Sequence, residues 1–188
     1  MICCAKKNIS REVENGSIFP DLRISITDSD ICSLATDYLL YGSPDSQISY
    51  IEGTLTLVEN ESTGEEPVQV GSFSCIFVRA YNNNSDFLMA ADQHDQKLYD
   101  SAFALYESQI IQRAEQTGML YIDHIFLDEE YRGKGTGRTL LPIIAYLAGR
   151  GASVVTAYVL AQFNNMFKSA GFFPIGREDR GIWAARLL

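Results

Sequence analysis

A short run of glycines and cations in the C-terminal half of the chain is suited to binding phosphate. It reads Arg132-Gly133-Lys134-Gly135-Thr136-Gly137-Arg138. Glycines let successive backbone N–H groups turn toward one ligand, because no Cβ obstructs them. A helix that starts within this run would add unpaired N–H groups and a partial positive charge. The sequence therefore predicts a pyrophosphate cradle, to which the three basic side chains add formal charge.

Three kinds of phosphate loop have to be separated. A Walker loop needs G-x-x-x-x-G-K-[ST], but here Lys134 precedes the glycine that it should follow. A dinucleotide fingerprint needs G-x-G-x-x-G, whereas residues 133–137 read G-x-G-x-G. The third pattern, R-x-x-G-x-G, is matched by Arg132, Gly135 and Gly137. A nucleotide-binding loop and a glycine turn that binds nothing stay open as alternatives.

The loop needs a strand before it and a helix after it. Apolar patterning predicts a strand over 119–127, a helix over 136–150 that contains Pro142, and a strand over 153–160. That length suits a right-handed crossover between parallel strands. Residues 1–20 look irregular, and residues 27–30 resemble helix caps. Further strands are predicted at 22–26, 48–59, 68–81, 172–176 and 182–187, and further helices at 31–39, 91–117 and 162–170.

The segment from Leu127 to Gly137 resembles the acyl-CoA-binding segment of the GNAT superfamily of N-acetyltransferases. A second likeness lies downstream, where residues 167–172 (FKSAGF) resemble the family's Tyr-x-x-x-Gly-Phe segment, and Ile182-Trp183-Ala184 fits its closing strand. The diagnostic part covers about residues 118–188. The resemblance implies one α+β domain over residues 1–188. It also implies a mixed, mainly antiparallel central sheet flanked by helices, in which the parallel strands 119–127 and 153–160 splay apart.

The resemblance implies that acetyl-CoA is the co-substrate of the chain. Backbone N–H groups of the loop would hold the pyrophosphate, and the end of the preceding strand would pair with the pantetheine arm. Strand N–H groups at the splay would polarise the thioester carbonyl. The residues that this assigns to acetyl-CoA are Ile125, Phe126, Leu127, Arg132, Gly133, Lys134, Gly135, Thr136, Gly137, Arg138, Asn164 and Phe167.

Transfer to an amine needs a base, because an amine with a pKa of about 10.4 is mostly charged at neutral pH. The family often places an acid on the strand before the loop, which makes Asp123 the first candidate and His124 the second. Alternation predicts that Tyr121, Asp123, Ile125 and Leu127 share one face of that strand. The plain alternatives are a hydrogen-bonded core or interface histidine, and an aspartate that only binds the amine or pairs with a neighbouring cation.

The family's general acid is a tyrosine four residues before the Gly-Phe pair, and this chain has Phe167 there. A phenyl ring has no proton to give. Tyr131 and Tyr158 are possible replacements, and the thiolate of coenzyme A can also leave unaided. Phe167 equally suggests a module that binds acyl-CoA without turning it over.

The sequence leaves the acceptor open between an amine-bearing small molecule and a protein or peptide. Glu52, Asp86 and Asp92 are candidates to attract a cationic acceptor, although each taken singly is better explained as a solvated surface acid. His94 is better explained as part of a helix start than as a catalytic group.

Composition excludes several other classes of function. The net charge of −9 and the lack of a basic stretch argue against nucleic acid. The four cysteines form no CxxC pair and the two histidines lie far apart, so no metal site is expected. We expect free thiols in the cytoplasm, no secretory signal and no membrane span. The resemblance also allows a homodimer.

Overall fold

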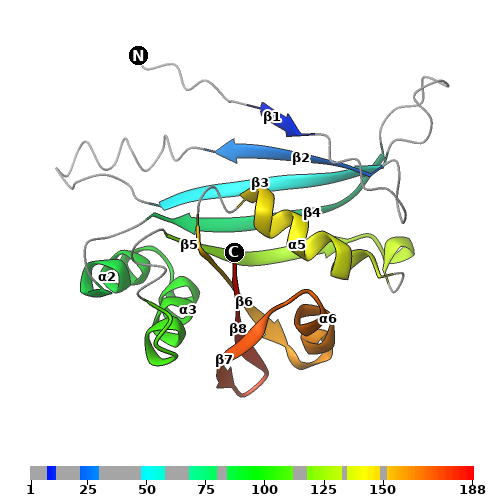
Figure 1. Ribbon diagram of the computed structural model, residues 1–188. Helices are drawn as coiled ribbons and strands as arrows, with labels where there is room; N and C mark the ends of the chain where they lie inside the picture. The colour runs from blue at the N-terminus through cyan, green and yellow to red at the C-terminus, as the bar shows by residue number, and fades with distance from the viewer. Residues whose placement is uncertain are drawn as a thin grey trace, which may run out of the picture.

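The computed structural model describes residues 8–11, 22–29, 48–57, 68–79, 84–111, 118–132, 135–148 and 152–188. One mixed sheet of eight strands runs through them in the order β1-β2-β3-β4-β5-β6-β8-β7 (Figure 1). The only parallel pair in this sheet is β5 with β6. The strands are β1 (Asn8–Arg11), β2 (Leu22–Ser29), β3 (Ile48–Leu57), β4 (Val68–Val78), β5 (Met119–Leu127), β6 (Val154–Leu160), β7 (Phe173–Glu178) and β8 (Gly181–Leu187).

Helices flank this sheet, which makes the fold α+β as the sequence predicts (Figure 1). Helices α2 (Asn84–His94) and α3 (Gln96–Glu107) join β4 to β5, and α5 (Thr136–Ala148) joins β5 to β6. The short helix α6 (Asn164–Ser169) follows β6 after a 3-10 turn at Ala161–Phe163. Pro142 lies inside α5, where the sequence places it.

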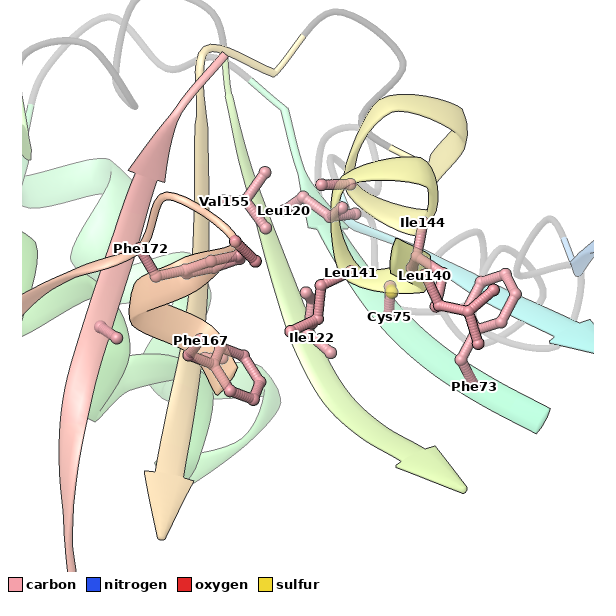
Figure 2. Close-up of a cluster of buried hydrophobic side chains, with 14 of the residues drawn as sticks. Phe73, Cys75, Leu120, Ile122, Leu140, Leu141, Ile144, Val155, Phe167 and Phe172 are labelled. Carbon is pink, nitrogen blue, oxygen red and sulfur yellow. The ribbon is translucent and has the colours of Figure 1, made fainter. Parts of the chain in front are cut away.

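Two apolar cores lie on opposite faces of the sheet. On one face, α2 and α3 cover Ile76, Met119 and Tyr121. On the other, Leu140, Leu141, Ile144 and Ala145 of α5 pack on a second set of strand residues (Figure 2). This second core contains Phe73, Cys75, Leu120, Ile122, Val155, Phe167 and Phe172. Each helix therefore buries one apolar stripe against the sheet, which is the main source of stability for helices of this length.

Two predictions for the N-terminal part were wrong. Residues 8–11 form β1, an edge strand that pairs with β2, although the segment 1–20 looked irregular. Residues 27–29, predicted as helix caps, continue β2 and pair with β3. Short polar residues are common at helix caps, but here ladder hydrogen bonds to a neighbouring strand decide the conformation. The predicted helix at 31–39 lies outside the described residues.

The helix predicted over 91–117 is two helices in the structure. Helix α2 ends at His94, and Asp95 is the N-cap of α3, with an extended backbone (φ −158°, ψ 138°). Its carboxylate accepts hydrogen bonds from the backbone N–H groups of Lys97, at 2.8 Å, and Leu98, at 3.2 Å. An aspartate competes well for such N–H groups, so it starts a new helix where apolar spacing alone suggests continuity.

Candidate functional site

The parallel strands β5 and β6 run together at their start and then diverge. Their ladder begins at Met119 with Val154 and ends at Ile122 with Ala157. Both strands continue beyond that point, β5 paired with β4 as far as Leu127 and β6 paired with β8 as far as Leu160. Figure 2 shows the two ribbons side by side at one end and apart at the other. The C-terminal halves of the two strands therefore present backbone edges to each other without pairing.

A β-bulge lies where the two strands separate. Across β4 and β5, Cys75 pairs with Ile122 and Ser74 with His124, so Asp123 is an extra residue on β5. The prediction that Tyr121, Asp123, Ile125 and Leu127 share one face was wrong. Tyr121 packs in the α2–α3 core, whereas Ile125 and Leu127 pack against the α5 core. One inserted residue resets the two-residue period, which is why alternation fails here.

The bulge brings two adjacent polar side chains to the surface together. The relative exposures of the Asp123 and His124 side chains are 39% and 55%. The His124 Nδ1 atom lies 2.7 Å from the Ser74 hydroxyl oxygen and 3.8 Å from a carboxylate oxygen of Asp123. The Ser74 hydroxyl also donates to Asp123 over 3.3 Å. The structure thus joins the two predicted base candidates and adds Ser74, which sequence reasoning missed because nothing near residue 74 shows its register with β5.

The segment after β5 leads directly into the glycine loop. The Asp128 N–H donates to the Val70 carbonyl over 2.9 Å, and a 3-10 turn follows at Glu129–Tyr131. Gly135 then has a φ of +83°, a conformation that side chains disfavour, and a Cβ there would meet no atom within 4 Å. Helix α5 begins at the next residue. The side of Gly135 on which a Cβ would lie is therefore open, next to a helix N-terminus, which suits a phosphate ligand.

Two loop residues have defined partners in the structure. The Arg132 Nε atom donates to the Leu127 carbonyl over 2.6 Å, and its guanidinium carbon lies 5.3 Å from the centre of the exposed Phe126 ring. Arg132 thus holds the end of β5. A Cβ at Gly137 would approach the Met166 sulfur to 2.5 Å, so the Met166 side chain of α6 would have to shift to admit any other residue. Gly133 and Lys134 and the side chain of Thr136 lie outside the described residues, and Arg138 is exposed.

The remaining predicted site residues are spread over several environments. Phe167 is buried in the α5 core, where its ring makes an edge contact with Phe172 at 5.1 Å between centroids (Figure 2). Tyr131 packs partly against the same core. Tyr158 is half-buried in the α2–α3 core and lies 4.9 Å from the Trp183 ring, centroid to centroid. Asn164 is exposed at the start of α6. Tyr131 and Tyr158 therefore lie against different cores, on opposite faces of the sheet.

Acidic groups influence the α2–α3 side of the diverging strands. Burial raises the pKa of the Tyr50 hydroxyl, and the carboxylates of Asp95 and Asp123 raise it further. Burial likewise raises the pKa of Tyr121, with smaller contributions led by Asp123 and Asp95. Both hydroxyls stay protonated at neutral pH. Asp95 and Asp123 therefore add negative charge to this side of the site, which suits a positively charged ligand. The three acids predicted to attract a cationic acceptor are exposed: Glu52, Asp86 and Asp92.

His94 is not a helix-start residue in the structure. It ends α2, and its Nε2 atom is hydrogen-bonded to the Tyr50 hydroxyl of β3. Burial lowers the pKa of His94, and the carboxylate of Asp95 opposes this shift. The imidazole is thus kept neutral by its surroundings and ties α2 to the sheet.

Two kinds of feature are absent from the described part of the chain. No group of three or more His, Cys, Asp and Glu side chains there is arranged to hold a metal ion. No helix in the described ranges is long and apolar enough to cross a membrane.

Comparison with known proteins identifies the family. The model of the acetyltransferase (GNAT) family matches residues 65–172, which is more than half of the chain. The chain therefore belongs to the acetyltransferase (GNAT) family. The match spans the hairpin strand β4, the diverging pair and the glycine loop, and it ends at Phe172. No curated protein matches the sequence.

Several solved structures are similar to this chain at low sequence identity. A mosquito arylalkylamine N-acetyltransferase-like protein (5b) is 12% identical, with a TM-score of 0.47 over 83% of this chain and 79% of that one. A putative N-acetyltransferase from Lactobacillus plantarum is 12% identical, with a TM-score of 0.46 over 89% and 99% of the two chains. AAC(6')-Ib in complex with ribostamycin and coenzyme A is 13% identical, with a TM-score of 0.42 over 75% of this chain and 64% of that one.

Proposed function

We propose that this chain is an N-acetyltransferase that transfers an acetyl group from acetyl-CoA to a primary amine. The observation that carries the proposal is the divergence of β5 from β6 immediately before a glycine loop at the start of α5. This arrangement offers backbone groups to an extended acyl-pantetheine arm and, one turn later, a site for its pyrophosphate. Membership of the acetyltransferase family supports the same substrate.

Residues of the loop and of β5 would bind acetyl-CoA. Gly135 would let the pyrophosphate approach the backbone, because it has no side chain and a Cβ in its place would meet no atom within 4 Å. Backbone groups from Ile125 to Leu127 would pair with the pantetheine arm on the edge that β6 leaves free. A strand N–H directed at the thioester oxygen would stabilise the negative charge that develops there during attack.

The chemistry requires one base on the acceptor side. The neutral amine nitrogen attacks the thioester carbonyl carbon, the C–S bond breaks, and coenzyme A leaves as a thiolate while the amine proton passes to the base. Asp123 and His124 are the candidates, since they lie exposed at the point of divergence. The carboxylates on the α2–α3 side would draw a cationic amine toward them.

Phe167 favours one alternative, a module that binds acetyl-CoA without transferring the acetyl group. The ring that stands at the family's tyrosine position is buried against Phe172 and donates no proton. This alternative shares the cofactor site with the main proposal and differs only in turnover. An acceptor screen therefore decides between them.

The first test is thermal unfolding with acetyl-CoA, desulfo-CoA and NAD, on the wild type, Gly135→Glu and Gly135→Ala. A ligand at a hundred times its Kd adds about 2.7 kcal/mol of stability. We expect both CoA compounds to stabilise the wild type. The glutamate variant should lose this effect, because a carboxylate in the cradle repels the phosphates. The alanine variant has the same backbone strain without the charge, so it should keep most of the effect.

Each outcome of this test has a clear meaning. Stabilisation by NAD alone would reject the CoA site in favour of a nucleotide-binding loop. Stabilisation by acetyl-CoA without acetyl transfer to any amine in a broad panel would favour the binding module. Transfer by the wild type, and a fall in kcat of about 10²- to 10⁴-fold in Asp123→Asn or His124→Gln, would support catalysis by the bulge residues.

A further inference from the structure

Ser74 lies between the two predicted base candidates and has no role in the proposal so far. It pairs with His124 across β4 and β5, next to the bulge that holds Asp123. Its hydroxyl oxygen is 2.7 Å from His124 Nδ1 and 3.3 Å from a carboxylate oxygen of Asp123. The three side chains therefore form a chain of contacts from carboxylate to hydroxyl to imidazole.

A count of protons fixes the direction of these hydrogen bonds. A serine hydroxyl has one proton, and an ionised carboxylate can only accept. The Ser74–Asp123 hydrogen bond can therefore form only with Ser74 as the donor, and we place the Ser74 proton there. The 2.7 Å contact must then be made by a proton on His124 Nδ1, which Ser74 accepts. Asp123, whose carboxylate oxygen lies 3.8 Å from the same nitrogen, favours a proton there for electrostatic reasons as well.

The opposite arrangement is worse on both counts. If Ser74 donated to Nδ1, its oxygen lone pairs would face the carboxylate of Asp123 at 3.3 Å with no proton between them. The carboxylate would also face a lone pair on the imidazole. The tautomer of a neutral histidine is set by the hydrogen bond that one of its nitrogens makes. Here two hydrogen-bond acceptors lie near Nδ1: the Ser74 hydroxyl oxygen and a carboxylate oxygen of Asp123.

We propose that Ser74 is a positioning residue that holds neutral His124 in its Nδ1–H form, so that Nε2 keeps its lone pair and acts as the base. This rests on the proposed acetyl transfer. In that step Nε2 would take the proton released by the amine and become part of an imidazolium. The Nδ1 proton stays on its nitrogen. The Ser74 hydroxyl, polarised by its hydrogen bond to the Asp123 carboxylate, stabilises the positive charge of the imidazolium. Asp123 takes up no proton.

The bulge explains how adjacent residues can act in one chain of contacts. In a regular strand, Asp123 and His124 would point to opposite faces of the sheet. The extra residue lets both side chains reach Ser74 on the neighbouring strand. The sequence order Asp-His thus becomes a hydrogen-bonded pair only through a serine that lies 49 residues before Asp123.

The direct test is the ring tautomer, read from the nitrogen chemical shifts of His124 by NMR in the ligand-free full chain. His94 is the other histidine, so a His124→Gln spectrum assigns the signals. We expect the Nδ1–H form in the wild type and in Ser74→Thr, which keeps a hydroxyl. We expect its loss in Ser74→Ala. Circular dichroism and thermal unfolding of each variant confirm that the fold is kept.

Kinetics give the second readout. Ser74→Ala should lower kcat by about 10- to 100-fold, by analogy with the loss of partners that orient metal-bound histidines. The KM for acetyl-CoA should change little, and Ser74→Thr should restore most of the rate. An Nε2–H tautomer in the wild type, or an unchanged tautomer in Ser74→Ala, would overturn the proposal even if kcat falls. The tautomer result does not depend on acetyl-CoA binding, so failure of the proposed function appears separately, as absent stabilisation by the ligand.

Discussion

The two halves of β5 are consecutive in the sequence but have different surroundings in the fold. Met119–Ile122 pairs with β4 on one side and β6 on the other, and no side chain in it is more than 4% exposed. In the other half, Asp123 is the extra residue of the bulge and His124–Leu127 pairs with β4 alone; Asp123, His124 and Phe126 are exposed. One strand thus provides both the centre of the core and the edge of the candidate site.

The difference shows how the fold separates stability from chemistry. The buried half is fixed by two ladders and by two cores, so it can hold the other half in place. The exposed half begins at the bulge, where the period changes and polar side chains reach the surface. A site built at the end of such a rigid element is placed more precisely than one built on a loop. Substitutions in the two halves should therefore act on different measurable quantities.

The largest expected effect on stability is in the buried half. Leu120 is fully buried, so Leu120→Ala should lower the free energy of unfolding by about 2–5 kcal/mol, through lost burial and a cavity. Phe126→Ala, in the exposed half, removes a ring that is 48% exposed and a contact with Arg132. It should cost about 1 kcal/mol or less. Urea denaturation of both variants without ligand makes the comparison, and equal losses would contradict the division of β5.

The sequence predicted the buried half well. Its bounds, 119–127 for the whole strand, match β5, and the hairpin of β3 with β4 and the helix α5 also appear where apolar periodicity places them. These elements are long and strongly patterned, so local signals and tertiary packing agree. The glycine loop was likewise visible, since glycines at the start of a helix are costly unless the backbone needs them.

What the sequence could not give depends on neighbours far along the chain. The bulge exists only because β4 and β5 pair with one residue of difference, so Asp123 cannot be recognised as the extra residue from its own segment. Ser74 follows from the same register. The break at Asp95 was hidden because helical spacing continues on both sides of it, and β1 was hidden because an edge strand of four residues has little periodicity to detect.

A smaller effect on stability concerns two polar side chains that are buried in the core and hydrogen-bonded to each other. Thr156 of β6 and Ser101 of α3 are fully buried and joined by a 2.7 Å hydrogen bond between hydroxyls. Ser101→Ala leaves the Thr156 hydroxyl without this partner and should cost about 1–3 kcal/mol of unfolding free energy. The double variant Ser101→Ala/Thr156→Val removes both hydroxyls, so it should be more stable than Ser101→Ala alone. Additive losses in a denaturant-based double-mutant cycle would show that the two hydroxyls are not coupled.

The smallest effect concerns the pH dependence of the unfolding free energy and arises from the half-buried His94. Burial lowers the folded-state pKa of His94 below its unfolded value of about 6.5. The unfolded chain therefore binds this proton more readily, and His94 contributes stability above about pH 6.5 that is lost as the pH falls through the folded-state pKa. Between about pH 7.5 and 5.5, wild-type protein should lose more unfolding free energy than His94→Gln, because the carboxylates titrate alike in both. Urea midpoints at the two pH values measure this difference. A loss in His94→Gln that equals or exceeds that of the wild type would mean that contact with Tyr50, rather than the neutral state of the ring, is what His94 contributes to the fold.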